Sequence, residues 1–251
     1  MSEPPPRDWD GATYDRIADP MTRWGADVLD RLPLEGDETV LDAGCGSGRV
    51  TQRLVERVPR GHVIALDASP SMVESARARL AGFGDRVEYA VADLGRPLPL
   101  GAASVDAVLS TATFHWVADH DALFANLATV LRAGGRLVAQ CGGGDNIARV
   151  RAAILEAGEA WQGPWTFETP HATRARLEAA GFRDVETWLS DEPTPIEPGE
   201  PLREYLRTVI LGAHLDRRPD SHRAAFVDAV AARLPDGVID YVRLNILATR
   251  A

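Results

Sequence analysis

The sequence predicts an α/β protein built on a doubly wound, seven-stranded, mostly parallel sheet with a small helical cap. From about residue 38, short β-branched apolar runs alternate with helical patterns, which is typical of a parallel sheet covered by helices on both faces. Glycine and proline mark the ends of these patterns. With 251 residues, the chain can bury a substantial core in one large domain with a modest appended cap.

Five strands are expected in the first part of the chain, with the sequences TVLDA, HVIALD, VEYAVAD, VDAVLS and RLVAQC. The helix after the first strand is predicted to begin at Ser47 or Gly48. Its apolar residues fall on one side at helical spacing, at Val50, Leu54, Val55 and Val58.

Two further helices are expected between these strands. Ser69 stands at the cap of the second helix and Pro70 at its first position, where a missing N–H costs nothing, and Gly82 ends it. The third helix is predicted to run from about Asp121 until Gly134-Gly135 stops it.

Beyond residue 141 the pattern is looser. A helix is expected through about Trp161. Another is predicted to begin at Thr169-Pro170 and to end at Gly181. The run FRDVETWLS predicts a sixth strand, and the four prolines within 191–201 predict a stiff, extended connector. Amphipathic helices follow over roughly 201–214 and 219–234. The final run, YVRLNILATR, predicts a strand that closes the sheet edge beside the sixth, antiparallel to it.

Composition limits the kind of protein this can be. The formal charge of −10 disfavours binding to a phosphate backbone, so nucleic acid is an unsuitable substrate. Two cysteines, Cys45 and Cys141, are too few for a disulfide framework and favour a reducing cytoplasm. The N-terminal segment lacks the pattern of a signal peptide, no apolar run is long enough for a membrane span, and the six histidines lack metal-ligand spacing. We therefore expect a cytoplasmic protein without a metal.

The strongest motif is VLDAGCGSGR, a strand followed by three alternating glycines and a helix. Because Gly44, Gly46 and Gly48 lack Cβ, the turn can form and a ligand can approach the bare backbone. A dinucleotide-binding turn would have a third glycine where this chain has Arg49. The carboxylate of Asp42 can hold an ammonium group, which suits a ligand with an amino-acid tail.

Two aspartates end the next strands, at the sheet edge where open α/β sheets bind ligands. Asp67 closes HVIALD and can accept hydrogen bonds from both hydroxyls of a ribose; the alternative is a helix-capping or turn role. Asp93 closes VEYAVAD and can bind an exocyclic amine of adenine while Leu94 packs on the ring; the alternative is an ordinary turn aspartate.

With these motifs in order over residues 38–141, the chain resembles the class I S-adenosylmethionine-dependent methyltransferases, which have a Rossmann-like fold. The closer resemblance is to the trans-aconitate methyltransferase group of small-molecule carboxyl methyltransferases. It rests on WDGATYDRIADP, on TATFHWVADHDALFANL and on a tail that contains HATRARLEAAGF. This resemblance implies S-adenosyl-L-methionine as cofactor and a small-molecule methyl acceptor.

The resemblance also implies roles for particular residues and regions. Tyr14 and Arg23 would lie over the methionyl carboxylate, and Thr111 would offer backbone to the amino group. Further cofactor contacts are expected at Cys45, Ala68 and Met72. Residues 1–37 would form cap helices over the cofactor, 38–145 its binding core, and 146–251 the rest of the sheet together with a substrate-side cap over about 146–170 and 195–235.

A carboxylate is already a nucleophile at neutral pH, so methyl transfer to it needs alignment, exclusion of water and cationic clamps rather than a triad. Candidate clamps in the cap are His171, Arg203, Arg207 and His214. His115 and Trp116 follow the fourth strand and are expected to face the acceptor. His115 can orient it or, for a hydroxyl or carbon acid, take its proton; alternatively it is a hydrogen-bonded core histidine. Trp161 and Trp165 wall an apolar pocket or simply bury against the core.

Other function classes remain open at this point. A nicotinamide-dependent oxidoreductase shares the fold, although Arg49 replaces the third glycine of its motif. Nucleic-acid methylation would show an (N/D)-P-P-(Y/F) segment where the chain has TATFHW. O- or C-methylation of a hydroxyl or carbon acid in a secondary metabolite is the nearest alternative, and a non-catalytic cofactor-binding domain is another.

Overall fold

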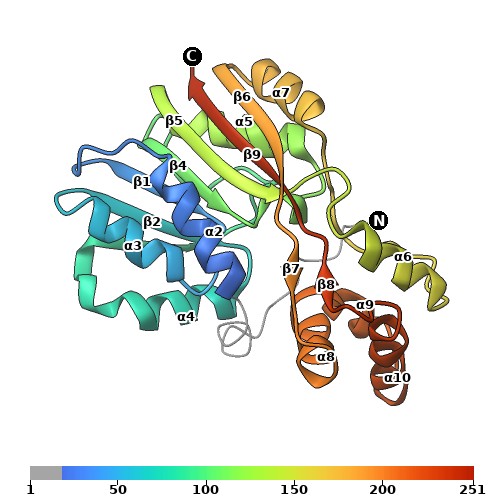
Figure 1. The fold of residues 1–251 in the computed structure, drawn as a ribbon. Helices are drawn as coiled ribbons and strands as arrows, with labels where there is room; N and C mark the ends of the chain where they lie inside the picture. The colour runs from blue at the N-terminus through green and yellow to red at the C-terminus, as the bar shows by residue number, and fades with distance from the viewer. Residues whose placement is uncertain (1–18) are drawn as a thin grey trace.

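The computed structural model describes residues 19–251, with side chains from residue 23 onward. Seven strands form one sheet in the order β3-β2-β1-β4-β5-β9-β6 (Figure 1). The strands are β1 (Thr39–Ala43), β2 (His62–Asp67), β3 (Val87–Val91), β4 (Val105–Thr111), β5 (Leu131–Gly142), β6 (Phe182–Asp191) and β9 (Val242–Arg250). The first five are parallel, and β9 runs antiparallel to both of its neighbours. The predicted fold class is therefore confirmed.

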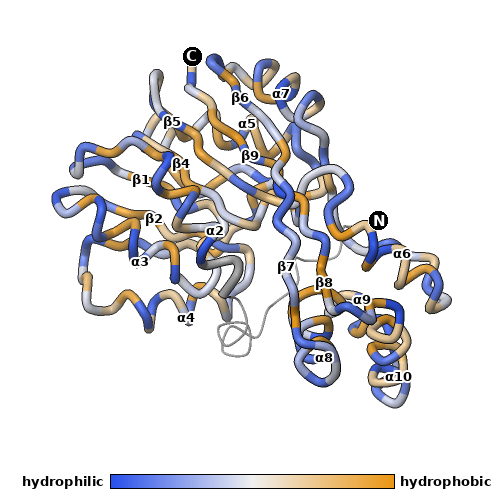
Figure 2. Tube along the Cα trace, viewed as in Figure 1, coloured by the Kyte–Doolittle hydropathy of each residue, from blue (hydrophilic) through white to orange (hydrophobic). Residues whose placement is uncertain are grey.

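Helices cover both faces of the sheet. The face that carries Val40 and Val63 is covered by α2 (Asp19–Asp30), α3 (Arg49–Arg57) and α4 (Pro70–Leu80). The opposite face, which carries Leu41 and Val108, is covered by α5 (His120–Val130) and α7 (Pro170–Ala179). Figure 2 shows the hydrophobic stretches that run through the central strands into these layers.

A third apolar cluster forms the cap beside the sheet (Figure 1). It is built from α6 (Ala148–Glu156), α8 (Glu200–Tyr205), a π-helical turn η3 (Leu206–Ile210), α9 (Gly212–Asp216) and α10 (Asp220–Ala231). Two extended segments join the cap to the sheet, and they pair with each other through β7 (Thr194–Pro195) and β8 (Val238–Ile239). The extended connector predicted over 191–201 thus contains one strand of this ribbon.

The position of the last strand differs from the prediction. β9 pairs with β6 as expected, but it lies between β5 and β6, so β6 is the edge strand. The side chains of β9 are mostly buried along its whole length, whereas most of those of β6 are exposed or partly exposed. A strand whose side chains are buried on both faces of the sheet suits an interior position, and a half-polar strand suits the edge.

Two predicted helix ends and the extent of one predicted helix also differ from the structure. α5 ends at Val130, and Leu131 already pairs with Val105 in the sheet, so Gly134-Gly135 lies within β5. α6 ends at Glu156 rather than near Trp161, because the N–H of Gly158 turns back to the carbonyl of Leu155. The single helix expected over 201–214 is divided into α8, η3 and α9.

None of the helices over residues 19–251 combines the length and apolarity that crossing a bilayer requires. Within the same range, no three His, Cys, Asp or Glu side chains are grouped as metal ligands.

Candidate active site

The carboxyl ends of β1, β2, β4 and β5 meet the start of β9 at one edge of the sheet, where the cap faces them. This edge is where open α/β sheets place their ligands. A cavity of about 1120 Å³ lies there. Pockets for one drug-sized ligand typically measure about 300–1,000 Å³, so this one has room for two reactants.

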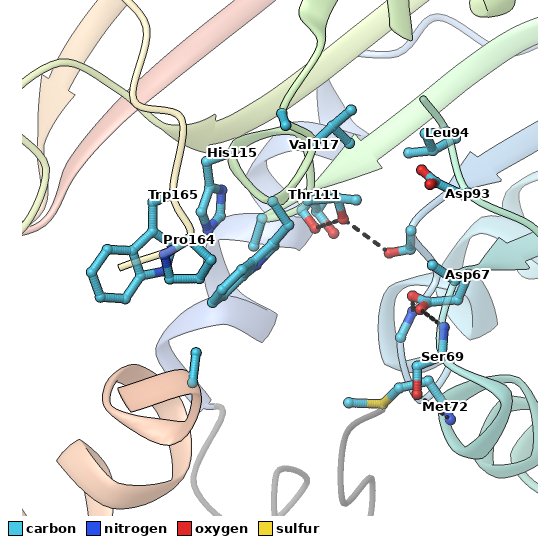
Figure 3. Close-up of a pocket in the computed structure, with 18 of the residues that line it drawn as sticks. Asp67, Ser69, Met72, Asp93, Leu94, Thr111, His115, Val117, Pro164 and Trp165 are labelled. Carbon is cyan, nitrogen blue, oxygen red and sulfur yellow. Dashed lines mark hydrogen bonds between the residues drawn. The ribbon is translucent and has the colours of Figure 1, made fainter. Parts of the chain in front are cut away.

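The cavity has two sides (Figure 3). We call the side that carries Gly46, Asp67, Met72 and Asp93 the glycine side. We call the side that carries His115, Trp116, Trp165, Ile210 and Arg243 the aromatic side. Thr111 lies between them.

The three glycines after β1 have three different reasons to be glycine, although all have positive φ, at 90°, 52° and 84°. A Cβ on Gly44 would lie 2.1 Å from Oγ1 of Thr113, and one on Gly48 would lie 3.2 Å from Ala76 of α4. A Cβ on Gly46 would meet nothing within 4 Å. Of the three, only Gly46 has open space where a Cβ would stand, as a ligand-contacting turn requires.

Asp67 ties this turn to the end of β2. One carboxylate oxygen accepts the N–H of Gly46 at 2.9 Å, and the other accepts the N–H of Ser69 at 2.9 Å (Figure 3). The carboxylate also lines the cavity. Because a carboxylate oxygen accepts more than one hydrogen bond, Asp67 can hold the turn and still accept from a ligand hydroxyl.

Asp93 and Leu94 close the glycine side. Oδ1 of Asp93 accepts the N–H of Gly95 at 2.9 Å, which fixes the turn after β3. The side chain of Leu94 is buried in the core and forms part of the cavity lining. Both residues are thus placed to meet a flat ring beyond the end of β3.

The turn after β4 packs against the glycine turn. The hydroxyl of Thr113 shares its one proton between the carbonyl of Thr111, at 3.0 Å, and that of Gly44, at 3.3 Å. Ala112 between the two threonines has a φ of 57°, a conformation that residues with a Cβ rarely adopt. These contacts hold Thr111 against the middle of the cavity.

Asp42 requires a correction, because it does not line the cavity. It is 1% exposed beneath the glycine turn, and its Oδ2 accepts the hydroxyl of Thr51 at 2.7 Å. Burial raises the pKa of Asp42 to about 7, an effect that Thr51 opposes and the charge of Asp67 reinforces. The structure therefore does not support direct contact between this carboxylate and a ligand ammonium.

His115 lies in the short 3-10 helix η2 (Phe114–Trp116) and is 7% exposed. Its Nδ1 accepts the N–H of Gly142 at 3.2 Å, which places the ring proton on Nε2. Burial lowers the pKa of His115 well below its ordinary value, and the charges of Arg243 and His120 lower it further. The imidazole is thus neutral and available as a donor, not as a base at Nε2.

Aromatic rings continue from His115 along the aromatic side. His115 stacks on Phe167 with ring centroids 5.8 Å apart, and Phe167 stacks on Trp165 at 5.8 Å. Trp165 in turn lies 6.1 Å from Trp116. Trp161 and Trp165 therefore do wall the cavity. Figure 3 shows Trp165 beside Pro164 on this side.

Sequence reasoning did not single out Arg243, which lies at the start of β9 and is 3% exposed. Its neighbour in the sheet is Gly142, whose N–H reaches His115. Asn146 and Tyr241 line the cavity nearby. The available signal was an arginine near the start of the mostly apolar run YVRLNILATR.

Most of the expected cofactor-contacting residues line the cavity, namely Gly44, Cys45, Gly46, Asp67, Ala68, Met72, Asp93, Leu94 and Thr111. Gly48 does not, because it packs against α4. Arg23 does not either: its side chain is 69% exposed and lies 3.8 Å from Glu192. Tyr14 lies outside the described residues.

The expected clamps for the acceptor are not on the cavity. Arg203 pairs with Asp228 at 2.7 Å, and Arg207 lies 3.7 Å from Glu200, both on the outer surface of the cap. His171 is exposed on α7. His214 is fully buried behind Trp161, whose carbonyl lies 3.1 Å from its Nε2. The acidic partners of the two arginines and the positions of the two histidines explain why these four side chains do not line the cavity.

The comparisons with known proteins agree with this geometry. A family model described as a methyltransferase domain matches residues 40–135. The phosphoethanolamine N-methyltransferase 2 of Haemonchus contortus, solved with S-adenosyl-L-methionine, has the same fold, with a TM-score of 0.65, 20% identity, and coverage of 96% of this chain and 56% of that one. The fold and the site define an S-adenosylmethionine-dependent methyltransferase.

Relatives that match most of this chain identify its family within this class of enzyme. The trans-aconitate 2-methyltransferase of Methylobacterium radiotolerans is 34% identical over 88% of this chain and 87% of its own length. That of an Acidovorax species is 31% identical over 97% and 99%. The chain belongs to the trans-aconitate 2-methyltransferase family.

Proposed function

We propose that this enzyme transfers a methyl group to a carboxylate oxygen of a small molecule. The observation that carries the proposal is the pairing of two buried donors on the aromatic side. These are the guanidinium of Arg243 and the Nε2–H of the neutral His115. Both suit an anionic oxygen acceptor, and a carboxylate nucleophile requires no proton removal.

The glycine side fits S-adenosylmethionine. The open backbone at Gly46 would meet the methionyl part, the carboxylate of Asp67 would accept from the ribose hydroxyls, and Asp93 with Leu94 would hold the adenine. Bound there, S-adenosylmethionine supplies an electrophilic methyl group on a positively charged sulfur.

The reaction balances without a general base. A bond forms between a carboxylate oxygen and the methyl carbon while the sulfur–carbon bond breaks and its electron pair goes to sulfur. No proton moves. The described residues then have three tasks: Arg243 and His115 orient the carboxylate, the aromatic rings exclude water, and the two sides of one cavity hold the reactants in line.

The printed names of the relatives support the carboxylate class, since they act on trans-aconitate, a tricarboxylic acid. Methylation of a hydroxyl or an acidic carbon is the second candidate. It needs a base, and the N–H of Gly142 already occupies Nδ1 of His115, which leaves Nε2 protonated. Carboxylate methylation is therefore the better fit.

We extend the proposal to the setting of the enzyme. The strongly acidic chain favours a small molecule over nucleic acid as acceptor. Both Cys45 and Cys141 are unpaired and buried, which suits a reducing cytoplasm.

The test replaces His115 in two ways. His115→Gln keeps an oxygen for the N–H of Gly142 and an N–H for the acceptor, so we expect at least about a tenth of the wild-type turnover. His115→Phe removes the donor and should mainly raise KM for the acceptor. His171→Gln, on the exposed face of α7, is the matched control. General-base catalysis is typically worth about 10²–10⁴-fold. A loss on that scale in His115→Gln, with cofactor affinity intact, would favour the hydroxyl or carbon acceptor instead.

A further inference from the structure

The aromatic side of the cavity has a charged end and an apolar wall. The charged end is formed by Arg243 with His115. The wall is formed by the rings of Trp116, Trp161 and Trp165 and by the aliphatic side chains of the cap turn η3. These two surfaces suit different parts of one molecule. Together they restrict which carboxylic acids can bind as the acceptor.

The charged end is fixed in position by the sheet. Nε of Arg243 donates to Oε1 of Gln140 at 3.4 Å, and Nε2 of Gln140 donates to Oδ1 of Asn245 at 2.9 Å. The guanidinium lies 4.8 Å over the ring of Trp24 on α2. A buried cation held in this way offers a defined place for one carboxylate, which needs such a partner when it leaves water.

The apolar wall is equally well supported. Trp165 stacks on Phe167 with an interplanar angle of 12°, and His214 lies 5.7 Å behind Trp165. Val209 and Ile210 of η3 are 8% and 3% exposed, and both line the cavity. A ligand that covers this wall with apolar atoms gains the free energy of burying both surfaces.

Of the other arginines in the described lining, two lie by the glycine side and one, Arg217, lies on the exposed side of the apolar wall. Arg49 is the first residue of α3, and Arg96 lies in the loop after β3, both by the glycine side. Arg217 is exposed and lies 4.4 Å over the ring of Trp161, next to Asp216 in the chain. Because Arg217 is exposed, a second or third carboxylate buried against Trp116, Trp165 or Ile210 would still meet no second buried cation among the described lining residues, which is costly.

Resting on the proposed carboxylate methylation, we propose that the preferred acceptor is an apolar monocarboxylic acid. Its carboxylate would bind at Arg243 and His115, and its hydrocarbon or aryl body would lie against Trp116, Trp161, Trp165 and Ile210. The enzyme would thus share the reaction of its tricarboxylate-named relatives but not their preference among acids.

The direct test compares two acids that share a trans-unsaturated carboxylate. Trans-cinnamate has a phenyl ring where trans-aconitate has further carboxylate groups. We expect kcat/KM to be at least tenfold higher for trans-cinnamate, since even one methylene in an apolar pocket changes this ratio about tenfold or more. An equal or higher kcat/KM for trans-aconitate would overturn the inference and leave carboxylate methylation standing. Failure of both acids to yield a methyl ester would refute the proposed function itself.

A variant pair tests the apolar wall independently. Ala213 of α9 lines the cavity, whereas Ala224 is exposed on α10 outside it. Ala213→Arg puts a cation on the wall and should lower the cinnamate-to-aconitate ratio of kcat/KM at least tenfold. Ala224→Arg should leave the ratio unchanged. A ratio that stays the same in a folded Ala213→Arg variant that still binds S-adenosylhomocysteine would show that the wall does not contact the acceptor.

Discussion

Replacing single glycines in the turn after β1 should separate ligand contact from folding. Gly46→Ala places a methyl group in open cavity, because the ideal Cβ meets nothing within 4 Å. Its cost to the fold is the left-handed backbone alone, with a φ of 52°, or about 1–2 kcal/mol. The same methyl group occupies space that the cofactor needs, and forced overpacking typically costs about 1–3 kcal/mol. We therefore expect cofactor affinity to fall by roughly 5–150-fold.

Gly48→Ala is the matched control. Its Cβ would lie 3.2 Å from Ala76 and 3.3 Å from Leu80 on α4, and its φ is 84°. Both the backbone strain and the crowding should therefore lower the free energy of unfolding rather than cofactor affinity. Calorimetric titration with S-adenosylhomocysteine and urea unfolding should show opposite rankings. Gly46→Ala should bind worse, and Gly48→Ala should unfold at lower urea. If Gly46→Ala binds within about twofold of wild type, the turn is not the cofactor site.

Three further predictions concern charged side chains. Asp67→Asn weakens both the hydrogen bonds accepted from a ribose and the bond accepted from the N–H of Gly46. Because hydrogen bonds to a charged group are worth about 1.5–3 kcal/mol, calorimetry should show that cofactor affinity falls about tenfold or more. An unchanged affinity would mean that Asp67 does not contact the cofactor. The pKa of Asp42 is higher in the folded protein, at about 7, than its ordinary value of 3.8. As the pH rises from 4 to 7, the cofactor-free wild type should therefore lose stability relative to Asp42→Asn, by up to roughly 4 kcal/mol in urea unfolding. Parallel pH profiles of the two proteins would contradict this. Arg203→Ala and Arg207→Ala change side chains on the outer surface of the cap. Each should leave KM for the acceptor unchanged and lower the free energy of unfolding by less than about 1 kcal/mol. A large rise in KM would mean that these arginines do bind the acceptor.

Local sequence signals were sufficient for the part of the fold that binds the cofactor. Strands and helices between residues 38 and 141 are set by short-range patterns, such as Pro70 at the first helical position and Ser69, whose hydroxyl accepts the N–H of Met72. The glycine spacing then predicts where the backbone must be bare. Only the structure distinguishes Gly46, where a Cβ would meet nothing within 4 Å, from Gly44 and Gly48, where it would meet neighbouring side chains.

The acceptor side was less predictable because it depends on how distant segments pack. Arg203 and Arg207 were plausible clamps by charge alone, but Glu200 and Asp228 hold them on the outer surface. The buried arginine that lines the cavity, Arg243, comes from the last strand, and its place follows from the insertion of β9 next to β5. That insertion was not expected, since the final strand was predicted at the sheet edge.

The chemical form of the product tests the central claim most directly. After turnover of an accepted acid with S-adenosylmethionine labelled in the methyl group, mild alkali should release the label from the product as methanol, because an ester hydrolyses under these conditions. We expect nearly all of the transferred label to be released. Label that remains in the product after alkali treatment would mean an ether or a carbon–methyl bond and would contradict methyl transfer to a carboxylate.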